Sequence, residues 1–194
     1  MSRYSPLLVV MALPVESSGV FESAGVTVEY TGIGKVNAAI ALCRRLADYR
    51  HVGLAPPRVV NFGTAGSHRL KTGSLVCCSR FMQRDMDVSA LGYSVGETPY
   101  EATPIQLQFE PTFKGLPDAL CGTGDSFATS GVGVECDVLD MEAYALAKVC
   151  YLSNVGFSCA KYVTDGADHA SALDWRANVD RAAHEFLRLY RTLG

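Results

Sequence analysis

The chain has 194 residues, of which 48% are hydrophobic and 19% are charged, and its formal net charge is -3. This length fits one domain with a sizeable core, so we expect a single domain over residues 1–194. The composition excludes a disordered chain, and it offers no broad basic surface for nucleic acid.

Cysteine usage and the N-terminal sequence indicate a cytoplasmic protein. The seven cysteines are an odd number and lack CxxC spacing, as expected for reduced thiols rather than a disulfide framework. The apolar run at residues 7–15 is interrupted by Pro14 and is too short to span a bilayer. We therefore expect no membrane contact.

The first half of the chain alternates strand patterns with loops and one helix pattern. We expect strands at residues 7–11, 26–30, 58–62 and 74–79, and a helix at residues 38–49. Glu16 lies in the loop after the first strand, where it is either a solvated side chain or a functional carboxylate. The small residues from Gly63 to Gly66 follow the third strand. They either let a ligand approach the backbone or form a tight turn, and spacing alone leaves both readings open.

Two loops resemble known ligand-binding motifs, one for phosphate and one for a metal ion, but both match poorly. Gly32-Ile33-Gly34-Lys35 has too few residues before its Gly-Lys pair for a Walker loop, and no Ser or Thr follows. A tight turn in front of the helix is the better interpretation. Residues 84–93 mix acidic and apolar side chains, but no His or Cys stands at ligand spacing, so we expect no metal site.

Residues 139–168 carry the strongest functional signal. Asp140 and Glu142 stand where a helix pattern begins, and residues 157–163 are apolar and β-rich, like a strand covered on both faces. Asp165 follows at the carboxyl end of this strand. Ligands of open α/β sheets bind at that edge. The sequence therefore predicts a candidate active site in which Glu142 and Asp165 share one rim of a sheet.

The remaining segments complete an α/β pattern. Residues 94–118 form an irregular connection with one β-like piece at residues 105–109. Phe127 follows another strand-to-loop transition, where its ring belongs either to the core or to a platform for a flat ligand. A terminal amphipathic helix is expected at residues 174–193. Alternating strands and helices predict helices on both faces of a sheet.

The order of the motifs resembles that of the nucleoside phosphorylase/nucleosidase superfamily. The motifs are VVMALPVE, TGIGKVNAA, NFGTAG, RDMDVSALGY, GTGDSF, LDMEAYALA and KYVTDGAD. Within this superfamily the chain most resembles the 5'-methylthioadenosine/S-adenosylhomocysteine nucleosidases. The resemblance implies a three-layer α/β domain, with a central mixed sheet flanked by helices, that acts on a small-molecule nucleoside without cofactor or metal. It also implies a cytoplasmic homodimer.

The resemblance implies a role for each matching residue. Asp165 matches the acid that protonates adenine N7, and Glu16 matches the carboxylate that activates water. Met141 and Glu142 match the ribose-binding pair, whereas Phe127 and Ala128 match the residues that stack on the base and read its edge. The rest of the expected substrate site comprises Thr64, Ala65, Gly66, Lys161 and Thr164, with Leu13, Val88, Leu91, Tyr93, Pro99 and Trp175 around the 5' substituent, partly across a dimer interface.

The chemistry of such a site calls for two carboxyl groups. Adenine is a poor leaving group as an anion, so an acid must protonate it as the glycosidic bond breaks. The sugar becomes cation-like, and a second carboxylate deprotonates the attacking water on its other face. The resemblance also bears on the nucleophile, because phosphorylase members of the superfamily hold phosphate with arginines in their early loops. No Arg occurs between Glu16 and Lys35, which favours water over phosphate.

Three departures from the family pattern leave alternatives open. The chain is short after Glu16 and after Pro99, and Lys161 stands where the family usually has Arg, which offers a different donor geometry. A purine nucleoside phosphorylase, a hydrolase of another nucleoside such as futalosine or an adenosyl-lipid precursor, and a non-catalytic nucleoside-binding protein are the competing hypotheses. The presence of both Glu16 and Asp165 favours an enzyme, since binding alone requires neither.

Overall fold

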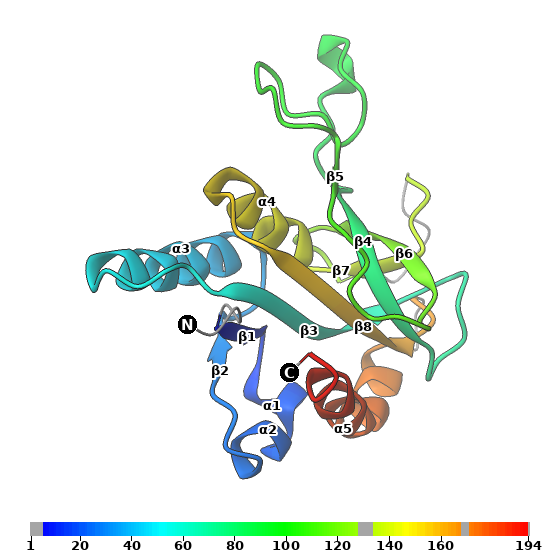
Figure 1. Cartoon of the computed structure of the whole chain (residues 1–194). Coiled ribbons are helices and arrows are strands. Elements are labelled where there is room, and N and C mark those ends of the chain that lie inside the picture. Colours follow the sequence, from blue (N-terminus) through cyan, green and yellow to red (C-terminus); the bar gives the residue numbers. More distant parts are fainter. Residues whose placement is uncertain (1–5, 128–133, 168–170, 194) are drawn as a thin grey trace.

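The computed structural model describes residues 6–127, 134–167 and 171–193. Its strands are β1 (Leu7–Met11), β2 (Val28–Tyr30), β3 (Arg58–Gly66), β4 (Leu75–Gln83), β5 (Gln106–Gln108), β6 (Asp118–Thr123), β7 (Val138–Asp140) and β8 (Phe157–Asp165). Its helices are α1 (Pro14–Ser17), α2 (Val20–Ser23), α3 (Lys35–His51), α4 (Ala143–Ser153) and α5 (Ser171–Tyr190), with a 3-10 turn at Ser89–Leu91. Figure 1 shows their arrangement.

The strands form one mixed sheet, as the family resemblance implied. The order is β2-β1-β3-β7-β6-β4-β5, and β8 pairs with both β3 and β4. β8 runs parallel to β3 and antiparallel to β4. Because β8 joins these two strands, the β3-β7-β6-β4-β8 part of the sheet closes on itself.

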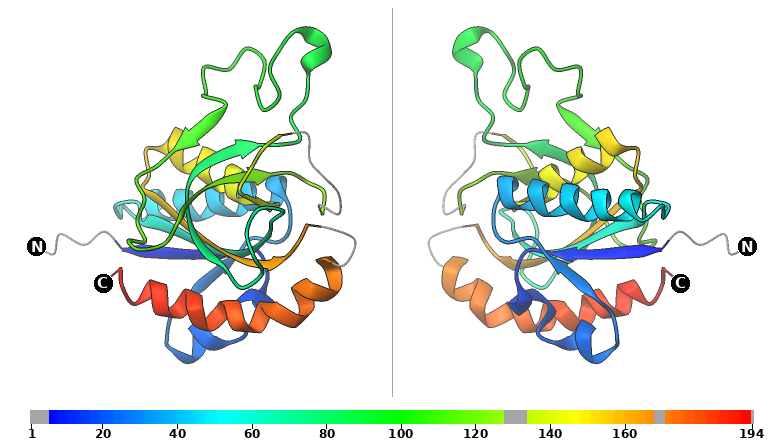
Figure 2. Two further views of the ribbon diagram at one scale, coloured as in Figure 1. Left: turned by 90° about the vertical axis from the view of Figure 1, so that its right-hand side faces the viewer. Right: turned by 90° about the vertical axis from the view of Figure 1, so that its left-hand side faces the viewer.

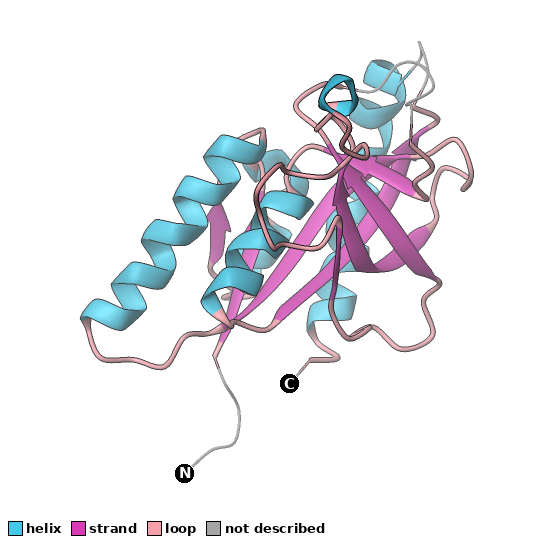
Figure 3. Ribbon diagram, turned by 90° about the horizontal axis from the view of Figure 1, so that it is seen from above, coloured by secondary structure: helices cyan, strands magenta, loops and turns pink. Residues whose placement is uncertain are grey.

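Helices cover the sheet from two sides, which confirms the expected layers (Figure 2). On one side α3 and α4 lie next to each other (Figure 3) and bury apolar side chains such as Leu42 and Leu146. On the other side α5 packs on β3 and β8. The rings of Phe62 on β3 and Phe186 on α5 stack with centroids 5.3 Å apart. Burial of these apolar side chains is the main force that holds the layers together.

Several elements run beyond the boundaries expected from sequence. β3 continues through Gly66, and β8 continues through Asp165, where a turn and a loop were expected. The two strands stay paired in parallel up to this point, with an irregularity between Ala65 and Gly66. Pairing with a neighbour thus overrides the loop-like composition of these ends. α4 is capped at its end by Asn154, whose left-handed φ of 53° is a conformation that Asn tolerates well at the end of a helix.

An arm formed by residues 84–105 extends away from the sheet between β4 and β5 (Figure 1). It carries exposed apolar and aromatic side chains, with Leu91 73% and Tyr100 98% exposed. The ring of Tyr93 meets that of Tyr100 edge to face, with centroids 6.2 Å apart. Among the described residues, no helix has the length and apolarity needed to cross a membrane.

Candidate active site

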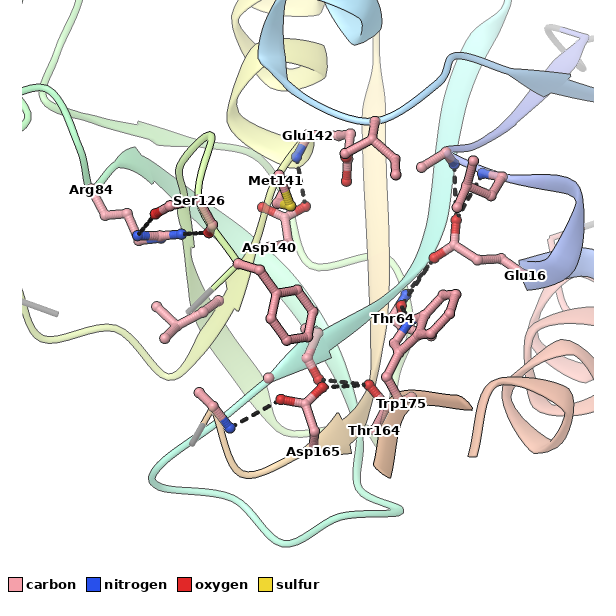
Figure 4. A pocket seen from close by; sticks show the side chains of 18 residues that line it. Glu16, Thr64, Arg84, Ser126, Asp140, Met141, Glu142, Thr164, Asp165 and Trp175 are labelled. Carbon is pink, nitrogen blue, oxygen red and sulfur yellow. Dashed lines mark hydrogen bonds between the residues drawn. The ribbon is translucent and has the colours of Figure 1, made fainter. Parts of the chain in front are cut away.

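A cavity of about 260 Å³ opens where several strands end. The ends of β1, β3, β7 and β8 and the segment after β6 all contribute side chains to it. Figure 4 shows these side chains around the cavity. The lining residues are Ala12, Leu13, Glu16, Ile33, Thr64, Ala65, Gly66, Arg84, Ser126, Phe127, Leu139, Asp140, Met141, Glu142, Thr164, Asp165, Ala167 and Trp175.

Most of the residues expected at the site line this one cavity. They are Leu13, Glu16, Thr64, Ala65, Gly66, Phe127, Met141, Glu142, Thr164, Asp165 and Trp175. Val88, Leu91, Tyr93 and Pro99 belong to the arm and do not line the cavity within this chain. Lys161 is buried behind the cavity wall, and Ala128 lies outside the described residues.

Glu16 is buried, with an exposed fraction of 5%, so the alternative of a solvated side chain is excluded. One carboxylate oxygen, Oε2, accepts hydrogen bonds from the backbone N–H groups of Ala12 at 3.0 Å and Leu13 at 3.1 Å. The other, Oε1, accepts from the Thr64 N–H at 2.9 Å and from the Thr64 hydroxyl at 3.1 Å. α1 therefore turns the carboxylate back across the end of β1 and onto β3.

Asp165 is 2% exposed and is held at the last position of β8. Its Oδ1 accepts the N–H of Ala167 at 3.0 Å, and its Oδ2 accepts the hydroxyl of Thr164 at 2.9 Å. The same hydroxyl also lies 3.4 Å from the Ala65 carbonyl oxygen. Since a hydroxyl both donates and accepts, Thr164 can serve Asp165 in its ionised and its protonated form.

Gly66 explains how Asp165 fits against β3. A Cβ atom at this position would stand 2.7 Å from Asp165 Oδ1 and 3.1 Å from the Cβ of Ala167. The sequence left open whether the small residues after residue 62 admit a ligand or form a turn. At Gly66, the group that approaches the backbone is the carboxylate of Asp165.

Asp140 and Lys161 form a buried ion pair beside the cavity. Their Oδ2 and Nζ atoms lie 2.8 Å apart, and Lys161 is 1% exposed. Burial disfavours the charged form of both side chains, but the attraction between the two opposite charges is the larger effect. The pKa of Asp140 is therefore lowered, and the pKa of Lys161 is raised well above its usual value. Lys161 therefore stays charged without reaching the cavity surface.

Glu142 lies beside this pair at the start of α4. Its Oε1 accepts the N–H of Gly34 at 2.8 Å, which links it to the turn before α3. Burial, followed by repulsion from the charge of Asp140, raises the pKa of Glu142 to about 8. A carboxyl group with this pKa is largely protonated near neutral pH, so it can donate a hydrogen bond as well as accept one.

Arg84 and Asp140 are functional candidates that the sequence did not single out as site residues. Arg84 extends along the segment after β6, where its guanidinium donates to the Ser126 hydroxyl at 3.2 Å and to the Ser126 carbonyl. These bonds fix the segment that carries Phe127. The signal that could have identified Arg84 is its position at a strand end. It was missed because the sequence predicted a strand that ends at residue 79, whereas β4 reaches residue 83.

Comparison with known proteins agrees with this architecture. The family model of the phosphorylase superfamily matches residues 17–122. A 5'-methylthioadenosine/S-adenosylhomocysteine nucleosidase from a Geobacillus strain is 32% identical, over 86% of this chain and 79% of the relative. A mutant of the Helicobacter pylori nucleosidase, with 5'-methylthioadenosine in its active site, superposes with a TM-score of 0.85 at 18% identity, over 100% of this chain and 98% of that one.

A futalosine hydrolase mutant of Helicobacter pylori is similar in fold as well. Its TM-score is 0.83 at 18% identity, and the match covers 97% of this chain and 98% of that one. Fold and site together therefore define a protein built for N-glycosidic bonds of nucleosides. The chain belongs to the phosphorylase superfamily, in the family of the 5'-methylthioadenosine/S-adenosylhomocysteine nucleosidases.

Proposed function

We propose that the protein hydrolyses the N-glycosidic bond of an adenine nucleoside of the 5'-methylthioadenosine or S-adenosylhomocysteine type, releasing adenine and the sugar. The observation that carries this proposal is the pair Glu16 and Asp165, two buried carboxyl groups from helix α1 and strand β8 that line one cavity. Hydrolysis of a glycosidic bond requires an acid for the leaving group and a base for the water.

The proton balance follows from these two groups. Protonated Asp165 donates its proton to N7 of adenine while the bond from C1' to the base breaks, and the base leaves neutral. Glu16 accepts a proton from the water whose oxygen bonds to C1'. The net reaction consumes one nucleoside and one water. Thr164 supports the acid because its hydroxyl donates a hydrogen bond to Oδ2 of the carboxylate that forms once Asp165 has given up its proton.

The rest of the cavity binds the substrate. Phe127, at the rim beside Ser126, stacks on the base, and Ala128 reads its edge. Glu142 and Met141 hold the sugar. The carboxyl group of Glu142 is fixed on one side by the Gly34 N–H, which leaves its other oxygen for a sugar hydroxyl.

The 5' substituent is expected between Leu13 and Trp175 and a second protein surface. Val88, Leu91, Tyr93 and Pro99 complete that pocket from the arm of a partner subunit in a homodimer. The exposed apolar side chains of the arm, above all Leu91, support this arrangement.

Charge pairing around the cavity favours water over phosphate. Arg84 is engaged by Ser126, and Lys161 is paired with Asp140. Lys35, at the start of α3, lies 2.5 Å from Asp85 and 3.7 Å from Asp125. A phosphate dianion would have to compete with carboxylates or carbonyls that these cations already bind. We place the reaction in methionine salvage in the cytoplasm, where such thio-nucleosides are produced and consumed.

The test is release of free adenine from 5'-methylthioadenosine, S-adenosylhomocysteine and adenosine, each with and without phosphate. We expect adenine without phosphate and no further increase when phosphate is added. Release that depends on phosphate would identify a phosphorylase instead. Turnover of futalosine, with none of the three adenine nucleosides cleaved, would move the assignment to another hydrolase of the same fold.

A further inference from the structure

We propose that Trp175 positions the Glu16 carboxylate through Thr64, so that the wall of the cavity controls the group that activates water. This inference rests on the proposed hydrolysis. It gives Trp175 a role beyond contact with the 5' substituent, and it turns Thr64 from a substrate contact into the link between the two.

Three side chains form a hydrogen-bonded chain in one direction. The indole Nε1–H of Trp175 donates to Thr64 Oγ1 at 2.9 Å, and Thr64 Oγ1 lies 3.1 Å from Glu16 Oε1. An indole N–H can only donate. The oxygen of Thr64 therefore acts as acceptor toward Trp175, and its single proton is directed to the carboxylate of Glu16. Figure 4 shows Trp175, Thr64 and Glu16 next to one another on the same side of the cavity.

The Thr64 hydroxyl is the only adjustable member of the four donors that bind Glu16 in the described chain. The other three are the N–H groups of Ala12, Leu13 and Thr64, which the backbone fixes. A carboxylate has about four lone-pair positions, so these donors occupy all of them. A water molecule that gives its proton to Glu16 must share or replace one donor. A hydroxyl can rotate away, whereas a backbone N–H cannot.

Trp175 holds the hydroxyl oxygen of Thr64 in place when the hydroxyl proton rotates. The indole lies near the start of α5 and lines the same cavity as Glu16. Its N–H holds Thr64 Oγ1 in place, so rotation of the proton leaves the oxygen 3.1 Å from Glu16 Oε1. Without the indole N–H, the Thr64 side chain is free to change rotamer, and the carboxylate loses its only adjustable donor.

The decisive variants remove one hydrogen bond each and keep the shape. Trp175→Phe retains an aromatic wall, Thr64→Val retains the branched shape, and Thr64→Ser retains the hydroxyl. We expect Trp175→Phe to lower kcat about threefold to tenfold with little change in KM, and Thr64→Val to lower kcat about tenfold. Thr64→Ser should restore most of the activity that Thr64→Val loses. The matched control is Thr112→Val, which removes a hydroxyl hydrogen-bonded to Ser158 outside the cavity and should leave kcat unchanged.

The double variant Trp175→Phe/Thr64→Val separates positioning from packing. If Trp175 acts through the Thr64 hydroxyl, the double variant is no slower than Thr64→Val alone. If the two fold-changes multiply, or if Trp175→Phe raises KM at constant kcat, Trp175 acts by contact with substrate and the proposal is wrong. Because the chain has one tryptophan, biosynthetic replacement by benzothienylalanine removes the N–H and keeps the bicyclic ring. This replacement should lower kcat by the same threefold to tenfold that we expect for Trp175→Phe, and it tests the proposal if the phenylalanine variant folds poorly.

A spectroscopic readout makes the test independent of turnover. The ultraviolet resonance Raman band that reports indole N–H hydrogen bonding should shift in Thr64→Val and stay in place in Thr64→Ser. An unshifted band in Thr64→Val would contradict the hydrogen-bonded chain. If the wild-type protein released no base from any nucleoside while the band still shifted in Thr64→Val, only the proposed function would be contradicted and the hydrogen-bonded chain would stand.

Discussion

Asp165 occupies a place that the chain has shaped around its two oxygens. The N–H of Ala167 and the hydroxyl of Thr164 hold the carboxyl group, and Gly66 leaves room for it against β3. An asparagine side chain has nearly the same size, but it carries no acidic proton. The proposed protonation of N7 therefore distinguishes the two residues by chemistry rather than by fit.

We expect Asp165→Asn to fold normally and to lose about two to four orders of magnitude in kcat, the usual contribution of a general acid. Single-turnover release of adenine measures the loss, and the thermal midpoint verifies the fold. The variant should still bind a substrate analogue, because the cavity is unchanged. Full turnover by Asp165→Asn would remove the proposed acid from the mechanism.

Glu142 should make the stability of the protein depend on pH. Its pKa rises from the usual 4.5 to about 8 in the folded protein, so the folded state keeps a proton that the unfolded chain releases. The stability from this group is complete below about pH 4.5 and declines as the pH rises to about 8. The slope within that window is at most about 1.4 kcal/mol per pH unit.

Glu142→Gln cannot ionise, so its free energy of unfolding should fall less than that of the wild type between about pH 5 and pH 8. Urea denaturation of both proteins at a series of pH values measures the difference. All other titrating groups are shared, so subtraction of the two curves isolates residue 142. Parallel curves would show that Glu142 does not hold the extra proton.

At the scale of elements, the sequence was most informative where the functional residues and the elements that carry them are neighbours in the chain. In the segment from Asp140 to Asp165 the start of the helix and the buried strand were both predicted, because a helix pattern and an apolar β-rich run follow one another closely. Glu142 and Asp165 were placed on one rim by that reasoning, and both line the cavity.

The strand ends and the ion pairs were harder to predict from the sequence. Gly63 to Gly66 have the composition of a loop, and only pairing with β8 shows that they are strand. The partner of Lys161 is Asp140, on another strand, and Arg84 binds Ser126 across two strands. No local periodicity encodes a contact between such distant residues. The resemblance placed Lys161 near the site, but only the three-dimensional structure shows that its side chain is buried in an ion pair with Asp140.

The close approach of β3 and β8 can be tested at Gly66. Gly66→Ala adds a Cβ atom 2.7 Å from Asp165 Oδ1, so the carboxylate must shift. We expect kcat to fall by at least about tenfold, with a loss of about 1–3 kcal/mol in stability. Enzyme assays and urea denaturation measure the two effects.

Gly156→Ala is the matched control, because it lies just before β8 at the end opposite to Asp165. Its added Cβ atom would meet the Arg58 side chain at 3.2 Å, and that side chain is able to move. This variant should keep its kcat. If Gly66→Ala kept its kcat as well, the position of Asp165 would not depend on the missing side chain at residue 66.

At the scale of the whole molecule, the arm exposes large apolar side chains to water, which is energetically unfavourable. Leu91 and Tyr100 are 73% and 98% exposed, and Val36 on α3 is 66% exposed. The base of the arm meets the start of α3 through the ion pair of Asp85 with Lys35. Large apolar side chains exposed on a projecting segment are typical of an interface, and a second copy of the chain is the occupant that would also complete the 5' pocket.

We therefore expect the wild-type protein to sediment as a dimer and Leu91→Glu/Tyr100→Glu to sediment as a monomer, because two buried charges oppose association. The monomer should keep its thermal unfolding transition and show a higher KM for 5'-methylthioadenosine than the wild type, since the arm residues expected at the 5' pocket lie outside the cavity of their own chain. Leu54→Glu is the matched control: Leu54 is 59% exposed just beyond α3 and away from the arm, and its replacement should leave the dimer intact. A variant that sediments as a monomer with unchanged KM would show that the partner's arm contributes nothing to the 5' pocket.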